Sequence, residues 1–572
     1  MSKEKFGGLK MRKTISVLMI AILLLTTLSG CKDKGGNKVE DVKFNLKGGV
    51  DYIDHSTTFD GNEMEYDESM WYVNDLKDVP LPDPQVFVED DVYYIVGTSD
   101  RSIGGKYGSV IDCYSTEDFV NYEEHLAIYD PAKYGGWEAA DARIYAPEIY
   151  CFDGVYYMYY SAIDEEGIRR NSVVVADNPL GPYKPLQNSK VNGLEAPVFL
   201  DKNTTLDVLD ITVFVDDDEK MYMYYSVAGN QGQYIVGVKL KSPYEADWST
   251  YTKIVEAGAL SSTNNILKPL TWEMYRKGLP IVEAPFMIKS GGKYYMTYSV
   301  NACWDKFYNV CYAVSDSPLG VYEKPFTPNG FWTNLLLGCP TTNIANATVY
   351  EQWAGFASGT AHHCFFKIGD QYMIGYHAHQ KRDNALNSEK YQRRYFAFEL
   401  LHFDESGVPF CNGPTYSIQP MPEWLSGYKN IATSAQVSAE NVTNPNAIND
   451  NYIVDCYNLA TEKGKEVDLG NGYSFIELKF DREYEIGGIA IYNSAYYERA
   501  LTELEYIDFG NGNAVKYPQF AYDKYMNADT EFIFPCSAFT IEFVNTFRAD
   551  HVVVCVNTQA AASLNEIVVL GR

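Results

Sequence analysis

The sequence predicts an all-β protein, in which a five-bladed β-propeller is followed by a β-sandwich, and three observations support this prediction. A short aromatic and β-branched run occurs five times, usually after an acidic or glycine-containing turn, as in the second strand of a hairpin. The spacing of these runs suits propeller blades, and the pattern stops near residue 428. The five runs are VYYIVGT from Val92, VYYMYYS from Val155, KMYMYYS from Lys220, KYYMTYS from Lys293 and QYMIGYH from Gln371.

The runs start 63, 65, 73 and 78 residues apart, which is too long for one strand pair and suits a four-stranded blade with its loops. A weaker motif follows in three repeats and is expected to form the outer strand and exit turn of a blade; it begins at Cys113, Val175 and Ala313. The propeller is therefore predicted over residues 76–420. Five blades that close a ring leave a central funnel, and a residue at the start of each innermost strand points into it.

The N-terminus has the features of an export signal. Basic residues at 10–13 precede an apolar run from Ile15 to Leu25, and Leu-Ser-Gly-Cys closes it at Cys31. The run is short for a membrane-spanning helix, and this order of parts is typical of a signal peptide. The closing sequence resembles the bacterial lipobox, in which the cysteine is lipidated after cleavage. We therefore expect residues 1–30 to be a lipoprotein signal peptide, Cys31 to anchor an exported protein to the bacterial cell surface, and residues 31–75 to form a tether and N-terminal segment.

Composition limits the class of protein further. With 46% hydrophobic and 22% charged residues in a chain of 572, a globular protein of two or three domains is expected. A net charge of −29 argues against a nucleic-acid partner, because phosphate binding needs a basic surface. Aromatic residues make up 15% of the chain and suit both blade packing and stacking on sugar faces.

A linker at 421–428 leads to a region of alternating short strands at 429–572, which predicts a β-sandwich. This region resembles the discoidin, or factor 5/8 type C, domain, which closes on a final strand like Glu566–Gly571. Such domains often bind galactose-type sugars. Two interpretations stay open, a carbohydrate-binding module and a domain that braces the propeller.

Three carboxylates precede predicted innermost strands. Asp83 lies in Leu-Pro-Asp-Pro-Gln-Val-Phe, Asp210 in Leu-Asp-Ile-Thr-Val-Phe and Glu283 in Val-Glu-Ala-Pro-Phe, ahead of the first, third and fourth blades. A charge at the entry of an apolar strand is unfavourable unless it has a task there. The three are therefore expected to converge at one mouth of the funnel.

Inverting glycoside hydrolysis needs such a group. One carboxylate takes a proton from water while a carboxylic acid protonates the leaving oxygen, and about 6.5–9.5 Å between them leaves room for the water. The acid must keep its proton near neutral pH, which a nearby like charge can arrange. Three carboxylates supply a base, an acid and a group that tunes the acid.

At these motifs the chain resembles glycoside hydrolase family 43, whose members are inverting five-bladed propellers, over roughly residues 76–410. The resemblance implies that Asp83 is the general base, Glu283 the general acid, and Asp210 the residue that tunes the pKa of the acid and orients it. Ile211 departs from the proline or small residue usual in the family. The implied activity is that of an α-L-arabinofuranosidase or β-xylosidase on arabinose- or xylose-containing plant polysaccharides or oligosaccharides, with exo action expected.

The resemblance also implies residues around the catalytic group. Tyr145 and Glu148, in Tyr-Ala-Pro-Glu, are expected to shape the pocket, and Arg394 to contact the innermost sugar or hold a carboxylate. His362, in Gly-Thr-Ala-His-His, is expected to face the axis near a structural calcium ion, with a buried structural histidine as the alternative. Glu195 lies in a second copy of the acid motif, Leu-Glu-Ala-Pro, but this copy comes before Asp210, out of the family's order.

Two other functions are considered. A galactan-acting exo-glycosidase of the same fold is the alternative enzyme. A non-catalytic glycan-binding surface lipoprotein is the alternative from another class, and the three carboxylates argue against it, because a pure binder does not need them in this order.

Overall fold

The structure is a computed structural model that describes residues 46 and 48–56 and most of the chain from 70 to 572. The longer stretches outside the description are 1–45, 57–69, 261–266, 274–279, 326–333, 339–356, 381–393, 454–465, 525–530 and 533–536. The predicted signal peptide and Cys31 therefore lie outside the described residues. Within the described part, no helix combines the length and the apolar character needed to cross a membrane.

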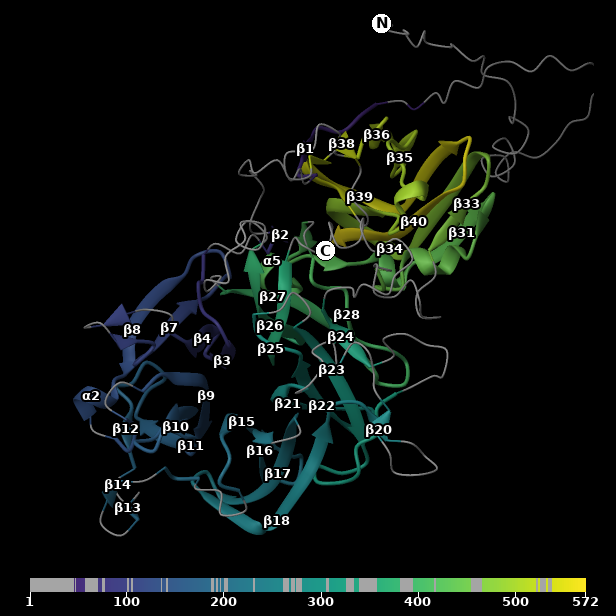
Figure 1. The fold of residues 1–572 in the computed structure, drawn as a ribbon. Coiled ribbons are helices and arrows are strands. Elements are labelled where there is room, and N and C mark those ends of the chain that lie inside the picture. Colours follow the sequence, from purple (N-terminus) through teal and green to yellow (C-terminus); the bar gives the residue numbers. More distant parts are fainter. Residues whose placement is uncertain are drawn as a thin grey trace, which may run out of the picture.

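Five four-stranded antiparallel sheets form the blades of a propeller, as predicted (Figure 1). Blade one contains β3 (Gln85–Glu89), β4 (Val92–Thr98), β7 (Ile111–Thr116) and β8 (Glu123–Tyr129). Blade two contains β9 (Ile144–Phe152), β10 (Val155–Ile163), β11 (Arg169–Ala176) and β12 (Lys184–Pro185). Blade three contains β15 (Val208–Val215), β16 (Met221–Gly229), β17 (Gly232–Ser242) and β18 (Glu245–Glu256). Blade four contains β21 (Val282–Ser290), β22 (Lys293–Val300), β23 (Asn309–Ser315) and β24 (Leu335–Leu337), and blade five contains β25 (Ala357–Ile368), β26 (Gln371–Gln380), β27 (Arg394–Phe403) and β28 (Pro409–Cys411).

Each of the five aromatic runs is the second strand of a blade, β4, β10, β16, β22 or β26. Their nearly continuous aromatic and apolar character suits this position, because both faces of a central blade strand pack against neighbouring blades. The weaker motif begins in the third strand, in β7, β11 and β23, and continues through the turn that follows; in blade two it also contains the outer strand β12, as expected.

The start of each innermost strand has an unusual backbone. One residue at this point in every blade has a positive φ: Asp83 (54°), Ala146 (43°), Asp210 (57°), Ala284 (49°) and His362 (49°). Positive φ is uncommon for residues other than glycine. In blades two to five a register shift lies at the same place, as in a β-bulge. A bulge interrupts the regular alternation of a strand and re-aims its side chains.

Hydrogen bonds link these positive-φ residues to the preceding blade. In four cases the acceptor is the last residue of an aromatic run: Ala146 N–H donates to Thr98 Oγ1 (2.9 Å), Asp210 N–H to Ser161 Oγ (3.0 Å), His362 N–H to Ser299 Oγ (2.9 Å) and Asp83 N–H to His377 Nδ1 (3.1 Å). The bond between His377 and Asp83 joins blade five to blade one. At the remaining step, Ala284 N–H donates to Asp210 Oδ2 (3.0 Å), and the buried Ser226 hydroxyl has no partner among the described residues. We call these five bonds the inter-blade ring.

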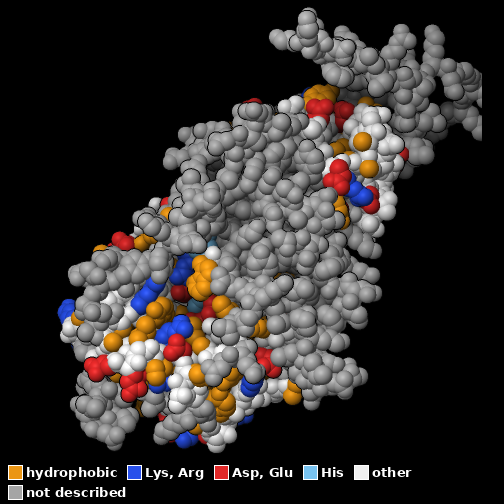
Figure 2. Space-filling view, viewed as in Figure 1, with side chains coloured by type: hydrophobic (Ala, Val, Ile, Leu, Met, Phe, Trp, Pro, Cys, Tyr) orange, Lys and Arg blue, Asp and Glu red, His pale blue; other side chains and the backbone are white. Residues whose placement is uncertain are grey.

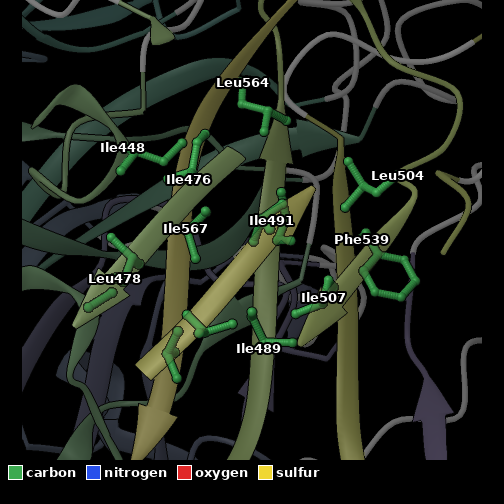
Figure 3. Packing of buried hydrophobic residues seen from close by; sticks show 14 of the residues in the cluster. Ile448, Ile476, Leu478, Ile489, Ile491, Leu504, Ile507, Phe539, Leu564 and Ile567 are labelled. Atoms are coloured by element: carbon green, nitrogen blue, oxygen red, sulfur yellow. The ribbon is translucent and has the colours of Figure 1, made fainter. Parts of the chain in front are cut away.

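The C-terminal region forms a separate sheet domain, consistent with the predicted β-sandwich. Its strands are β30 (Lys429–Asn430), β31 (Gln436–Glu440), β32 (Val442–Thr443), β33 (Val467–Leu469), β34 (Gly472–Asn493), β35 (Tyr506–Asp508), β36 (Ala514–Lys516), β39 (Ala538–Thr558) and β40 (Ala562–Gly571). Register shifts in the long pair β34 and β39 accompany its bending. A cluster of buried aliphatic and aromatic side chains fills the domain, among them Ile489, Phe539 and Ile567 (Figure 3). The resemblance to discoidin domains stays a prediction.

Short elements complete the described fold. They are the strand pairs β5 (Ser102–Ile103) with β6 (Lys106–Tyr107), β13 (Lys190–Val191) with β14 (Leu194–Glu195), β19 (Ala259–Leu260) with β20 (Leu267–Lys268), and β37 (Asp523–Lys524) with β38 (Glu531–Phe532), and the short helices α2 (Pro131–Tyr134), α5 (Glu423–Ser426), Ala432–Ser434, Pro445–Ile448 and Tyr497–Arg499.

The N-terminal segment, for which the sequence showed no pattern, belongs to both domains. Strand β1 (Tyr52–Asp54) pairs with β39 of the C-terminal domain, and β2 (Trp71–Tyr72) pairs with β29 (Gln419–Pro420) at the end of the propeller. Trp71 is fully buried, and its ring packs so closely on Gly488 of β34 that a Cβ there would lie 2.8 Å from it. Its cluster includes residues from blades three and four and from the C-terminal domain, so one hydrophobic core spans both domains.

Polar contacts reinforce this junction. The Tyr492 hydroxyl donates to the carbonyl of Ile418 (3.1 Å), and the Asn412 amide donates to the carbonyl of Asn451 (2.7 Å). Buried and paired polar groups of this kind fix the relative position of two surfaces, because each would be left unsatisfied if the surfaces shifted.

We expect Trp71→Ala to destabilise the protein by about 3–5 kcal/mol, the range for truncating a large buried aromatic side chain. Because Trp71 contacts both domains, urea unfolding followed by tryptophan fluorescence and circular dichroism should show both domains unfolding earlier. Trp424→Ala is the control, since this side chain is 58% exposed and its loss should cost only about 0.5 kcal/mol or less. Equal effects of the two substitutions would contradict the shared core.

Candidate active site

Asp83 lies at the start of blade one in a nearly closed environment. Its side chain is buried, and the Thr98 hydroxyl donates to Oδ2 (2.6 Å) while the Arg394 guanidinium donates to Oδ1 (2.8 Å). The same Thr98 oxygen accepts the Ala146 N–H, so its hydroxyl proton is free to point at Asp83. The carboxylate is thus fixed by one bond from its own blade and one from blade five.

The surroundings of Asp83 favour its charged form. Burial alone would raise the pKa of this carboxyl, but Arg394 and then His362, whose Nδ1 lies 3.3 Å from Oδ1, hold the pKa well below its usual value of 3.8. The His377 ring is neutral, because burial lowers its pKa well below the usual value of 6.5. Its Nδ1 accepts the Asp83 N–H, so that nitrogen carries no proton, and the 3.4 Å contact with Oδ1 is not a hydrogen bond of the neutral ring.

Asp210 begins blade three and faces the opposite electrostatic situation. Burial raises the pKa of Asp210 to about 7; negative charge on Glu283 and Asp83 acts in the same direction, whereas His362 opposes it. Its Oδ2 accepts the N–H of Ala284, the residue next to Glu283. Asp210 therefore contacts the acid motif through the backbone as well as through its charge.

Glu283 lies one residue before the positive-φ position, whereas Asp83 and Asp210 occupy it. The three are therefore not strictly equivalent, although the sequence suggested the same place for each. Burial raises the pKa of Glu283 to about 7; the charge on Asp83 also raises it, while the hydrogen bond from the Tyr308 hydroxyl to Oε1 (2.9 Å), Arg169 and Arg394 lower it. The charge on Glu283 in turn raises the pKa of Asp210.

The other predicted pocket residues surround this group. Tyr145 occupies in blade two the position that Glu283 has in blade four, since each pairs with the serine that ends its aromatic run. Glu148 is buried deeper, where it accepts a hydrogen bond from Tyr150 (2.5 Å); burial is the main reason that its pKa rises to about 8. Arg394 forms an ion pair with Asp83, and a contact with the sugar stays a prediction.

The copied acid motif lies elsewhere. Leu194–Glu195 forms β14 of a small strand pair between blades two and three, and not the start of an innermost strand. This placement agrees with its position out of order in the sequence.

The proposed calcium ion was tested against the donors present. Among the described residues, no group of three or more histidine, cysteine, aspartate or glutamate side chains is arranged to hold a metal ion. His362 lies beside Asp83, whose two oxygens already accept bonds from Arg394 and Thr98. A calcium site through His362 and water stays a prediction.

Three residues of the group were missed by the sequence analysis. Thr98 and His377 end the first and fifth aromatic runs, so their polar character at a repeated position was a usable signal. Tyr308 is 1% exposed and directly precedes β23, and no recognisable motif surrounds it in the sequence. Figure 2 shows the face on which basic, acidic and histidine side chains lie together in a hollow of the propeller.

With this geometry described, comparison with known proteins identifies the family. Residues 72–409 match glycosyl hydrolases family 43, and the chain belongs to this family of glycosidases. It is similar to xylosidase/arabinosidase 43A of Humicola insolens, at 30% identity over 46% of this chain and 84% of the relative. It is also similar to beta-D-galactofuranosidase xynD of Aspergillus niger (25% identity, 57% and 80%) and to extracellular exo-alpha-(1->5)-L-arabinofuranosidase ArbA of Cellvibrio japonicus (23% identity, 58% and 86%).

The arrangement can perform acid–base chemistry at neutral pH. Asp83 is ionised there and can accept a proton, while Glu283 retains a proton in a large fraction of molecules because its pKa is raised. A carboxylate and a carboxylic acid with separated pKa values in one pocket are the pair that general acid–base catalysis requires.

We expect kcat/KM to fall as pH rises through about 7, because Glu283, with its raised pKa, is protonated below that pH and loses its proton above it. On the acid side, activity should persist below about pH 4, because Asp83 has a lowered pKa and stays ionised. A profile of kcat/KM from about pH 3 to 9 measures both limbs. An alkaline limb near the ordinary pKa of glutamate, about 4.3, would contradict the assignment of the acid.

We expect Asp83→Ala and Glu283→Ala to differ in their dependence on the leaving group. Asp83→Ala should slow every substrate by about 10²–10⁴-fold, the usual contribution of general acid–base catalysis. Glu283→Ala should slow alkyl glycosides to a similar extent but spare dinitrophenyl glycosides, whose leaving group needs no proton. Glu195→Ala is the matched control and should behave as wild type. Uniform losses for Glu283→Ala across leaving groups would exclude it as the acid.

Proposed function

We propose that this glycosidase hydrolyses terminal pentose residues of plant polysaccharides or oligosaccharides with inversion, as an α-L-arabinofuranosidase or β-xylosidase. The observation that carries the proposal is the opposite tuning of Asp83 and Glu283 in one buried group. Asp83 takes the proton of a water molecule as the water oxygen attacks the anomeric carbon. Glu283 gives its proton to the glycosidic oxygen, which leaves with the electron pair of the broken C–O bond.

Asp210 assists without forming a bond to the substrate. Its carboxyl repels the charge that Glu283 would acquire and so favours the protonated acid. Through its bond to the Ala284 N–H it also holds the backbone beside Glu283. These are the tuning and orienting roles that its motif implies.

The names of the relatives support the substrate class. Two of them denote xylosidase or arabinosidase activity, and one of these denotes exo action. A second candidate, an exo-enzyme acting on galactose-containing chains, is favoured by the galactofuranosidase among the relatives, since galactofuranose and arabinofuranose are both five-membered rings. Cys31 supports a further part of the proposal, that the enzyme is exported and lipid-anchored to the bacterial surface.

Hydrolysis of nitrophenyl α-L-arabinofuranoside, β-D-xyloside, β-D-galactofuranoside and β-D-galactopyranoside separates these candidates. We expect the highest kcat/KM for one of the two pentosides. A galactoside preferred over both would replace the pentose assignment with the second candidate, and hydrolysis of none by a folded protein would contradict both.

Inversion makes an independent prediction about the product. Proton NMR of the first turnovers should show the released sugar with the anomeric configuration opposite to that of the substrate, before mutarotation mixes the two forms. A product that first retains the configuration, or a glycosyl-enzyme trapped by a fluoro-sugar, would contradict direct attack by water.

A further inference from the structure

Tyr308 contacts the general acid in a way that the family motifs do not specify. It is 1% exposed, and its hydroxyl donates to Oε1 of Glu283 at 2.9 Å. Among the residues that the structure describes, Tyr308 donates the one hydrogen bond that the Glu283 carboxyl receives. Burial raises the pKa of Tyr308 well above 10, so the phenol stays a donor over the whole working range of pH.

The ring of Tyr308 is itself held in place. It stacks on His377, with ring centroids 5.6 Å apart and planes 22° apart. His377 is fully buried and accepts the N–H of Asp83. A single stack therefore connects the residue that holds the base to the residue that holds the acid.

The loop that carries Tyr308 is anchored to the same strand as His377. His379, two residues further along β26, contacts the carbonyl of Cys303 through Nε2 at 2.7 Å, a distance at which the ring N–H donates. Cys303 and Tyr308, which lie in the described parts of the connection between β22 and β23, thus both contact blade five. A phenol held at both its ring and its loop can define the direction of a carboxyl.

We propose that Tyr308 is the positioning residue of the general acid, which holds Oε1 of Glu283 so that Oε2 carries the proton for the leaving oxygen. An oxygen that already accepts a hydrogen bond along this direction is the poorer place for the acidic proton, so the proton occupies the other oxygen. During the reaction the Oε2–H bond breaks, the proton goes to the glycosidic oxygen, and the negative charge left on the carboxylate is stabilised by Tyr308.

This inference rests on the proposed role of Glu283 and predicts the direction of a pH shift. A donor to a carboxylate stabilises the charged form, so removing the Tyr308 hydroxyl should raise the pKa of Glu283. The alkaline limb of kcat/KM should then move to higher pH. At the same time, turnover of alkyl glycosides should fall, because the carboxyl is no longer directed at the leaving oxygen.

Tyr308→Phe tests this with little change in shape, because the ring and its stack on His377 are kept. We expect an alkaline limb at higher pH and a loss of about tenfold or more in kcat for alkyl glycosides, with dinitrophenyl glycosides little affected. The control is Tyr224→Phe in blade three, which removes an equally buried hydroxyl that donates to the carbonyl of Pro318, and which should leave the pH profile unchanged.

Replacement of Tyr308 by 3-fluorotyrosine provides a second measurement that keeps the hydroxyl. A fluorinated phenol is the stronger donor, so the alkaline limb should move to lower pH, opposite to the effect of Tyr308→Phe. If the alkaline limb of kcat/KM stays in place in both Tyr308 variants, and Glu283→Ala abolishes that limb, only the positioning role of Tyr308 is overturned. A limb that survives in Glu283→Ala would instead show that Glu283 is not the acid, and both proposals would fall.

Discussion

The inter-blade ring is the constraint on which the active site depends. At each of its five steps, the amide of a residue with positive φ donates to the preceding blade, and the last step joins blade five to blade one. A strained backbone persists only when its surroundings hold it there, and here each amide is paired with a buried acceptor. Three of the five residues that donate these bonds, Asp83, Asp210 and His362, also carry the ionisable side chains of the site. Closure of the propeller and assembly of the site therefore depend on the same set of hydrogen bonds.

The chemistry depends on the way this symmetric ring is made asymmetric. Asp83 and Asp210 occupy equivalent places and are both buried, yet their pKa values move in opposite directions. The difference is the guanidinium of Arg394, which forms an ion pair with Asp83 and holds its pKa down. The step between blades three and four is also distinct, because Asp210 replaces the Ser226 hydroxyl as acceptor. These two departures from the fivefold pattern separate the pKa values of buried carboxyl groups that otherwise occupy similar places.

Much of the fold could be predicted from the sequence, because aromatic and β-branched runs that recur at a blade-like spacing indicate a propeller. The three carboxylates could also be found, since charges at apolar strand entries contradict their local environment. The offset of Glu283 by one residue could not, because it depends on where the bulge lies in the register. Tyr308 could not be found either, since its partner lies in another strand. The pairing of β1 with β39 could not be predicted, because a three-residue strand is too short to show a sequence pattern.

The pairing of Tyr52 with Phe543 has a consequence for how the chain reaches its native state. A ribosome releases β1 before any blade, but β39, the strand that pairs with it, is made after all five blades. The blades can form in order as they emerge, since their strands are neighbours in sequence, whereas β1 and β39 must find each other across the finished propeller. Until then, Trp71 and the apolar surface around it stay uncovered, and this interval is when the nascent protein is most exposed to aggregation and to chaperones.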